Sequence, residues 1–274
     1  MHYIDSHQHF WQLNRGDYDW LTPNLIPLYR NFLPNDLSPT LSDLNIHGTI
    51  LIQAAPTLNE TFFMLQLAKQ HPFILGVVGW IDMLSDHAAN DLAALIENPL
   101  FCGIRPMLQD IPDPDWMLQK KLTPLFKLLE TTGKTFDALV LPKHLPNLMR
   151  LLDKHPELNV VIDHGAKPAI KSNQLQPWAN DMKTIAECPN VYCKFSGLIT
   201  EANADASFDA LIPYIDHLFS TFNYQRIMWG SDFPVLNLAS DYRKWFNFCH
   251  DYVSRLGTQA LEMVFGKVAA EFYL

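Results

Sequence analysis

Two histidines near the start of the chain lie one residue apart, in the stretch YIDSHQHFW. Side chains alternate across a β-strand, so His7, His9 and Asp5 are expected on one face of a strand formed by this stretch. Two imidazoles on one face can supply two nitrogen ligands to a single divalent ion. The chain has 11 histidines, so an H-x-H pair alone favours packing over metal binding, and a metal site needs further ligands.

Further groups of the right type follow two later apolar segments. VVIDHGAKP places His164 at the end of one such segment, and MWGSDFP places Asp232 at the end of another. Alternation points Asp163 away from His164, so we expect Asp163 to cap the turn that follows. A third imidazole and a carboxylate, brought from separate strands, would complete a site with His7 and His9.

Short β-branched segments recur along the chain, each followed by a longer segment with helical periodicity. The predicted strands are Tyr3–Phe10, Thr49–Ala55, Ile74–Ile81, Cys102–Met107, Thr135–Val140, Asn159–His164, Val191–Phe195 and Arg226–Ser231. The predicted helices are Glu60–Gln70, Asp86–Glu97, Trp116–Thr132, Leu145–Lys154, Trp178–Glu187, Phe208–Thr221, Tyr242–Arg255 and Thr258–Tyr273. Such alternation predicts an α/β fold, a distorted (β/α)8 TIM barrel that forms a single domain over residues 1–274. A doubly wound open sheet is the main alternative, but the chain lacks the GxGxxG and Walker motifs typical of that fold.

Polar residues end the other predicted strands as well: Gln53, Asp82, Arg105, Asp137, and Lys194 with Ser196. Polar groups at the C-terminal ends of barrel strands are typical of an active site. Structural interpretations stay open for three of them. Asp137 is also suited to cap a turn, and Lys194 to pair with a buried carboxylate. For Asp82 a structural role and a role in the site are equally favoured.

Residues 12–35 form a connection that is too long for a simple link between a strand and a helix. They contain four aromatic residues and two arginines: Tyr18, Trp20, Tyr29, Phe32, Arg15 and Arg30. Long loops in compact domains are often functional, so this segment is predicted to be an active-site loop insertion. The last two predicted helices are additions that follow the eighth strand.

Composition excludes several classes of partner. The net charge is −9 and no cluster of lysine and arginine occurs, which argues against nucleic acid or an anionic membrane surface. No apolar run reaches transmembrane length and no signal peptide is visible, so a cytoplasmic protein is predicted. The four cysteines show no metal-binding spacing and are predicted to be reduced thiols. The expected partner is a small molecule, and the oligomeric state stays open.

The motifs resemble those of the amidohydrolase superfamily, and more narrowly its sugar-lactone hydrolase branch. The resemblance is carried by DSHQHFW, GDYDWLTP, YRNFLPNDL, ILIQAAPTLNET, GVVGWIDM, GIRPMLQD, FDALVLPKHL, VIDHGAKP and GSDFPV. It implies hydrolysis of a lactone similar to L-fuconolactone or L-rhamnonolactone to its aldonic acid. Arg105 and Asp137 stand where members with two metal ions carry a bridging ligand and a histidine. The resemblance therefore implies one divalent cation, zinc before any other, or catalysis without a metal.

The resemblance and the strand-end pattern together assign roles to individual residues. Asp232, His164 and Arg105 are the predicted catalytic residues, with Asp232 as the general base. The predicted metal ligands are His7, His9, His164 and Asp232. The predicted substrate-binding residues are Trp20, Arg30, Gln53, Trp80, Asp82, Lys194 and Trp229.

Three alternatives remain at this level. The same barrel and the same strand-end groups serve non-oxidative decarboxylases of aromatic or muconate-type acids. Amide or cyclic-amide hydrolysis would use the same groups on another carbonyl. A non-catalytic binding protein on a degenerate barrel would show no turnover of any lactone.

Overall fold

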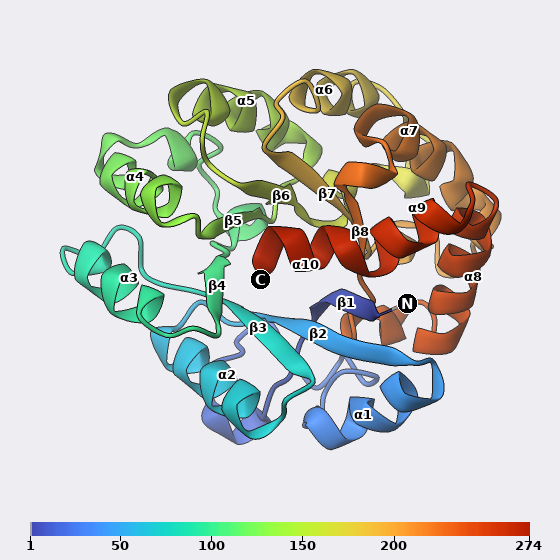
Figure 1. Cartoon of the computed structure of the whole chain (residues 1–274), viewed down its shortest axis with the longest axis horizontal. Coiled ribbons are helices and arrows are strands. Elements are labelled where there is room, and N and C mark those ends of the chain that lie inside the picture. The colour runs from blue at the N-terminus through green and yellow to red at the C-terminus, as the bar shows by residue number, and fades with distance from the viewer. Residues whose placement is uncertain (1) are drawn as a thin grey trace.

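A computed structural model describes residues 2–274. Eight parallel strands form one sheet in the order β1 to β8, with helices around the outside (Figure 1). The strands are β1 (Tyr3–Gln8), β2 (Ile46–Ile52), β3 (Ile74–Gly79), β4 (Phe101–Ile104), β5 (Thr135–Ala138), β6 (Val160–Ile162), β7 (Val191–Phe195) and β8 (Ile227–Trp229). The predicted (β/α)8 barrel is confirmed, although most of its strands are shorter than predicted.

Helices follow the strands along the chain, and α1 to α8 pack on the outer face of the barrel (Figure 1). They are α1 (Pro34–Asp43), α2 (Leu58–Gln70), α3 (Ala88–Ile96), α4 (Thr123–Thr132), α5 (Leu145–Lys154), α6 (Trp178–Ile185), α7 (Ile212–Phe222), α8 (Tyr242–Ser254), α9 (Thr258–Glu262) and α10 (Val268–Tyr273). A π-helical turn over Met263–Lys267 joins α9 to α10. None of the helices within residues 2–274 has the length and apolar character that a membrane crossing requires.

Two helices differ from the prediction for reasons that involve proline. Helix α1 was not predicted, because Pro39 interrupts the apolar pattern. The start of α1 is fixed by Pro34 and by Asp36, whose carboxylate accepts a hydrogen bond from the Leu33 amide. Residues 116–122 form two short 3-10 turns instead of the first part of a long helix. Helix α4 begins only at Thr123, because a proline is favoured in the first turn of a helix and Pro124 occupies that place.

The seam between β8 and β1 closes the barrel just beyond the end of β8. The backbone amide of Asp232 donates to the His7 carbonyl at 2.8 Å, and the His9 amide donates to the Phe233 carbonyl at 2.7 Å. These bonds tie the segment after β8 to the C-terminal end of β1. The seam thus brings Asp232 next to both histidines of the H-x-H pair.

The interior of the barrel is apolar at the end where the strands begin. Its residues come from six strands and from α10: Ile4, Ile50, Ile52, Val78, Cys102, Val161, Met228, Val268, Ala269 and Tyr273. Helix α10 lies across this end, near the barrel axis (Figure 1). The C-terminal helix therefore acts as a plug, and the polar groups are confined to the opposite end of the interior.

A substitution at Gly103 tests how closely the strands pack. A Cβ atom at Gly103 of β4 would overlap the backbone carbonyl and the hydroxyl of Thr135 on β5. Because a neighbouring strand cannot move aside, we expect Gly103→Ala to lower the free energy of unfolding by about 1–3 kcal/mol. Urea unfolding followed by circular dichroism measures the change.

Gly48→Ala is the matched control for this prediction. The added Cβ at Gly48 meets only the side chain of Leu75, which is flexible and half-buried. We expect this variant to lose clearly less stability than Gly103→Ala. Equal losses would contradict the close backbone approach between β4 and β5.

Candidate active site

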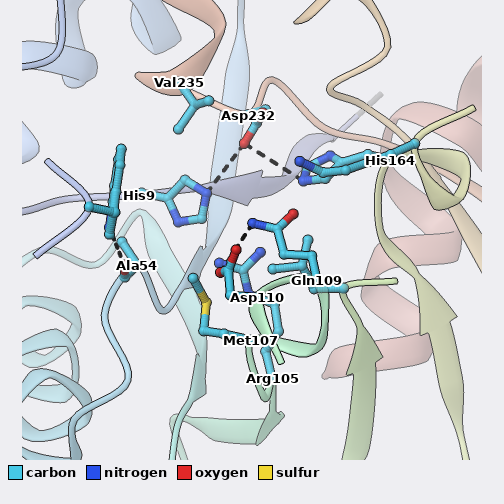
Figure 2. A pocket seen from close by; sticks show the side chains of 12 residues that line it. His9, Ala54, Arg105, Met107, Gln109, Asp110, His164, Asp232 and Val235 are labelled. Carbon is cyan, nitrogen blue, oxygen red and sulfur yellow. Dashed lines mark hydrogen bonds and ion pairs between the residues drawn. The ribbon is translucent and has the colours of Figure 1, made fainter. Parts of the chain in front are cut away.

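A cavity of about 270 Å³ opens at the C-terminal end of the barrel. Figure 2 shows the polar side chains that converge on it, with Asp232 between His9 and His164. The residues that line it are His9, Trp20, Ala54, Arg105, Met107, Gln109, Asp110, Leu139, His164, Lys167, Asp232 and Val235. They come from loops that follow different strands, as is usual for active sites of this fold.

Three imidazoles surround one oxygen of the Asp232 carboxylate. Asp232 Oδ1 lies 3.3 Å from His9 Nε2, 3.7 Å from His7 Nε2 and 3.9 Å from His164 Nε2. The Nε2 atoms of His7 and His9 are 3.2 Å apart. All four groups are buried. The structure thus brings together the four residues that the sequence predicted as metal ligands.

The orientation of the His9 ring directs Nε2 at this cluster. His9 Nδ1 lies 2.8 Å from the carbonyl oxygen of Ile52. A carbonyl oxygen only accepts hydrogen bonds, so Nδ1 carries a proton and Nε2 is the ring nitrogen that faces Asp232. His7, His9 and Asp232 could hold one cation between them. Two or three imidazole nitrogens and a carboxylate oxygen are a ligand set that suits zinc.

His7 has partners that suit either protonation of its ring. Its Nδ1 lies 3.1 Å from Lys194 Nζ, which donates, and 3.5 Å from Asp163 Oδ1, which accepts. With a proton on Nδ1, the ring donates to Asp163 and leaves Nε2 free to bind a cation. With a proton on Nε2, the ring accepts from Lys194 and donates to His9 Nε2. The His7 ring therefore has hydrogen-bond partners in either protonation state.

Left-handed backbone conformations set the directions of His164 and Asp232. Their φ angles are +53° and +59°, and Gly165, Ala166 and Lys167 are also positive. For residues other than glycine this conformation costs about 1–2 kcal/mol each, so packing must maintain it. Trp178 Nε1 donates to the Gly165 carbonyl at 2.7 Å and anchors the turn from outside the barrel.

The prediction that Asp163 caps a turn is wrong, and the left-handed turn after β6 explains why. Strand β6 ends at Ile162, so alternation no longer applies to the residues that follow. Asp163 is fully buried in the interior of the barrel. Instead of capping a turn, its carboxylate contacts Arg105 and Lys194. Asp5 is likewise misplaced by alternation, because β1 is irregular between Asp5 and Gln8 and Asp5 accepts from Tyr242 of α8.

A network of buried charges lies below the histidine cluster. Lys194 Nζ lies 2.5 Å from Asp137 Oδ2 and 3.0 Å from Asp163 Oδ1. Arg105 Nη1 donates to Asp163 Oδ2 at 3.2 Å. Tyr273 of α10 donates to Asp137 Oδ2 at 2.6 Å from the plugged end. Lys194 thus pairs with buried carboxylates, one of the two roles its sequence position suggested, and Asp137 caps no turn.

The charge states of the cluster follow from burial and neighbours. Burial lowers the pKa of His164 to about 4, so its ring is neutral at physiological pH. Burial and the adjacent Lys194 charge hold the pKa of His7 well below its usual value. Burial opposes ionisation of Asp232, but His164 beside it and a hydrogen bond from His9 hold its pKa below the usual range. The site therefore presents one ionised carboxylate beside the neutral rings of His7 and His164.

One wall of the cavity is held by Glu60, which is fully buried. Both oxygens of its carboxylate accept the Ala54 amide at 3.0 Å, and Oε2 accepts the Ala55 amide at 2.7 Å. The Ala54 carbonyl in turn accepts from Trp20 Nε1 at 2.7 Å. Glu60 thus fixes the turn after β2 and, through Ala54, the position of the indole that lines the cavity.

A family model described as amidohydrolase matches residues 4–274 of the chain. The chain belongs to the amidohydrolase family. It is 41% identical to the L-fucono-1,5-lactonase of Burkholderia ambifaria, over 98% of this chain and 94% of that protein. It is 31% identical to the L-fucono-1,5-lactonase of Burkholderia multivorans, over 98% of this chain and 95% of that protein.

Solved structures resemble the whole of this amidohydrolase. An amidohydrolase from Burkholderia multivorans with bound zinc is 31% identical and superposes with a TM-score of 0.94, covering 100% of this chain and 99% of that one. A dihydroxybenzoic acid decarboxylase from a Polaromonas species is only 14% identical, with a TM-score of 0.66, covering 99% and 96% of the two chains. At 14% identity, the comparison with the decarboxylase shows only that the two folds are alike.

Four predicted substrate-binding residues of the amidohydrolase lie outside the cavity. Trp229 points outward and packs on Phe265, because its neighbour Met228 faces the interior and side chains alternate. Arg30 lies on the surface, where it pairs with Asp36 at 2.8 Å. Trp80 and Asp82 follow the end of β3 and do not reach the lining. The structure therefore does not place these four residues in the lining of this cavity, and their substrate contact stays a prediction.

Two other predicted residues, Gln53 and Lys194, lie beneath the cavity. Gln53 Oε1 accepts from Arg105 Nε at 3.1 Å and Nη2 at 2.8 Å, and the Gln53 carbonyl also accepts from Nη2. Gln53 and Lys194 are both fully buried and position their neighbours instead of lining the cavity. Of residues 12–35, Trp20 lines the cavity; the role of the whole segment as an active-site loop stays a prediction.

The sequence analysis missed several residues that line the cavity: Met107, Gln109, Asp110, Leu139, Lys167 and Val235. Each lies two to five residues beyond a strand-end residue that was singled out, namely Arg105, Asp137, His164 or Asp232. Their side chains depend on loop geometry that alternation does not describe. Lys167 carried one usable signal, because it lies three residues after His164 in the same motif.

The buried carboxyl of Glu60 predicts a pH-dependent stability. Burial raises the pKa of Glu60 to about 8, from an ordinary value of 4.5. Between these values the folded protein holds a proton that the unfolded chain has released, so stability falls as pH rises from about 5 to 8. Glu60→Gln removes this ionisation, and the free energy of unfolding of this variant, measured by urea titration, should vary less over that pH range.

Glu157→Gln changes an exposed glutamate and is the control. Its free energy of unfolding should vary with pH as in the wild type. If Glu60→Gln also kept the wild-type variation with pH, the raised pKa would not belong to Glu60.

Proposed function

We propose that this amidohydrolase opens a sugar-derived lactone to its aldonic acid. The observation that carries the proposal is the ionised Asp232 carboxylate, set among three imidazoles at the end of a cavity. An ionised carboxylate beside an ester carbonyl can accept a proton from water and so activate the water for attack. The identity to two L-fucono-1,5-lactonases over nearly the whole chain supports a lactone as the substrate.

In the proposed reaction Asp232 acts as general base and then as general acid. A water molecule attacks the carbonyl carbon of the lactone while Asp232 accepts its proton. The carbonyl oxygen gains negative charge, and the adjacent Arg105 guanidinium stabilises that charge. The bond from the carbonyl carbon to the ring oxygen then breaks, and Asp232 returns the proton to the leaving oxygen. The product is an open-chain hydroxy acid that carries a carboxylate.

We further propose that His7, His9, His164 and Asp232 can hold one divalent ion, with zinc as the first candidate. Their nitrogen and oxygen atoms lie together at the end of the cavity, and His9 directs its Nε2 at the centre of the group. A bound zinc ion would supply Lewis-acid polarisation of the carbonyl. One ion is proposed rather than two, because Arg105 and Lys194 already neutralise Asp163, the nearest additional carboxylate.

Isothermal titration with zinc sulfate tests the metal proposal without reference to activity. The chain, first dialysed against a chelator, is expected to bind one equivalent of zinc. His9→Asn should weaken this binding at least about tenfold, because one nitrogen ligand is lost. His87→Asn, an exposed histidine outside the cluster, is the matched control. Zinc binding unaffected by His9→Asn would contradict the proposed ligands.

A screen with a pH indicator over D- and L-aldonolactones, including L-fuconolactone, tests the reaction itself. Acid should be released without carbon dioxide, which separates lactone hydrolysis from decarboxylation. Asp232→Asn should lower kcat at least about a hundredfold, the low end of the loss expected for a general acid–base group.

The control for this screen is Asp82→Asn, because Asp82 is exposed and outside the cavity. It should retain wild-type turnover, and circular dichroism should show both variants folded. Near-wild-type turnover by folded Asp232→Asn would remove the proposed base. Release of carbon dioxide from a carboxylated substrate would favour the decarboxylase instead.

A further inference from the structure

Gln109 and Asp110 form a polar wall of the cavity on a short turn, Leu108–Asp110, that follows β4. Figure 2 shows both side chains in the same close view as His9, His164 and Asp232, with the Gln109 amide directed at the Asp110 carboxylate. The turn is anchored by the buried side chain of Leu108 and by hydrogen bonds from the Leu108 amide to Pro106 and from the Asp110 amide to Met107. Neither residue takes part in the proposed chemistry.

The Asp110 carboxylate is exposed at the mouth of the cavity and retains most of its capacity to accept hydrogen bonds. Within residues 2–274 its side-chain partner is the Gln109 amide, at a long 3.4 Å. A carboxylate has about four acceptor positions, so the remaining positions can accept from a ligand. Asp232, the other carboxylate of the cavity, is already surrounded by imidazoles.

The two cations that line the cavity are bound to the protein itself. Arg105 donates to Gln53 and to Asp163 through all three of its nitrogens. Lys167 Nζ lies 3.5 Å from a carboxylate oxygen of Glu201. The cavity therefore offers an anionic acceptor with unused capacity, while each cation has a carboxylate counterpart. This balance favours a neutral ligand rich in hydroxyl donors and disfavours a ligand that carries its own carboxylates.

We propose that Asp110, oriented by Gln109, is the specificity-determining residue that accepts hydrogen bonds from hydroxyl groups of a polyhydroxylated lactone. The inference rests on the proposed function and goes beyond it, because it assigns the selection of hydroxylated over plain lactones to one side chain. Two hydroxyls on adjacent carbons can each donate to one oxygen of the same carboxylate. Hydrogen bonds to a charged acceptor are the strong ones, so their loss should be visible in kinetics.

Two lactones with different numbers of hydroxyl groups test the assignment. L-Fuconolactone is a polyol, whereas δ-valerolactone has an ester ring and no hydroxyl. For Asp110→Ala we expect kcat/KM on L-fuconolactone to fall roughly tenfold to hundredfold, mainly through KM. On δ-valerolactone the change should stay within about twofold of wild type. Where turnover of δ-valerolactone is too slow to follow, its inhibition constant against L-fuconolactone gives the same comparison.

Two further variants separate the carboxylate from the turn that carries it. Gln109→Leu should lower the ratio of kcat/KM on L-fuconolactone to that on δ-valerolactone by a smaller factor. It removes a neutral partner of Asp110 and leaves the Asp110 charge in place. Asp113→Asn changes an exposed carboxylate on the next turn, outside the cavity, and should leave both lactones unaffected.

The outcomes distinguish the inference from the proposed function. A selective loss on L-fuconolactone in Asp110→Ala supports the assignment. Equal losses on both lactones, or no loss on L-fuconolactone, overturn it while lactone hydrolysis stands. A wild-type enzyme that hydrolyses no lactone overturns the proposed function and this inference with it.

Discussion

The hydrogen bonds that join the end of β8 to the end of β1 are the constraint on which the site depends. The amide of Asp232 donates to the carbonyl of His7, and the amide of His9 donates to that of Phe233. The same two bonds close the barrel and place the carboxylate against two imidazoles. Barrel closure and assembly of the site are therefore one event, and any slip in the register of this seam would separate the base from its neighbours.

Electrostatic balance is the second condition for the site. Burying charged groups is costly unless each one has a partner, and this barrel buries Lys194, Arg105, Asp137 and Asp163 together. Burial, and for His7 also the Lys194 charge, keeps the rings of His7 and His164 neutral, and Asp232 stays ionised. The network thus separates two tasks: the lower groups neutralise one another, and the upper groups remain free for a ligand.

The sequence predicts the barrel and its four convergent ligands because both depend on short-range patterns. Strands and helices alternate visibly, and His7, His9, His164 and Asp232 lie at or just beyond the C-terminal ends of strands. Other predictions failed where a strand ends earlier than its apolar run. Alternation then assigns the wrong direction, as it does for Asp163. Residues such as Asp110 were missed because a loop's path, set by long-range packing, decides which of its side chains enter the cavity.

The plug formed by α10 has a consequence for how the protein is made. Tyr273 follows every strand of the barrel in the chain, yet its hydroxyl completes the hydrogen bonds of Asp137, next to Lys194. During synthesis the ribosome delivers the strands first and the plug afterwards. This end of the barrel, with Asp137 and Lys194 beside it, can therefore be closed against water only once α10 has been made.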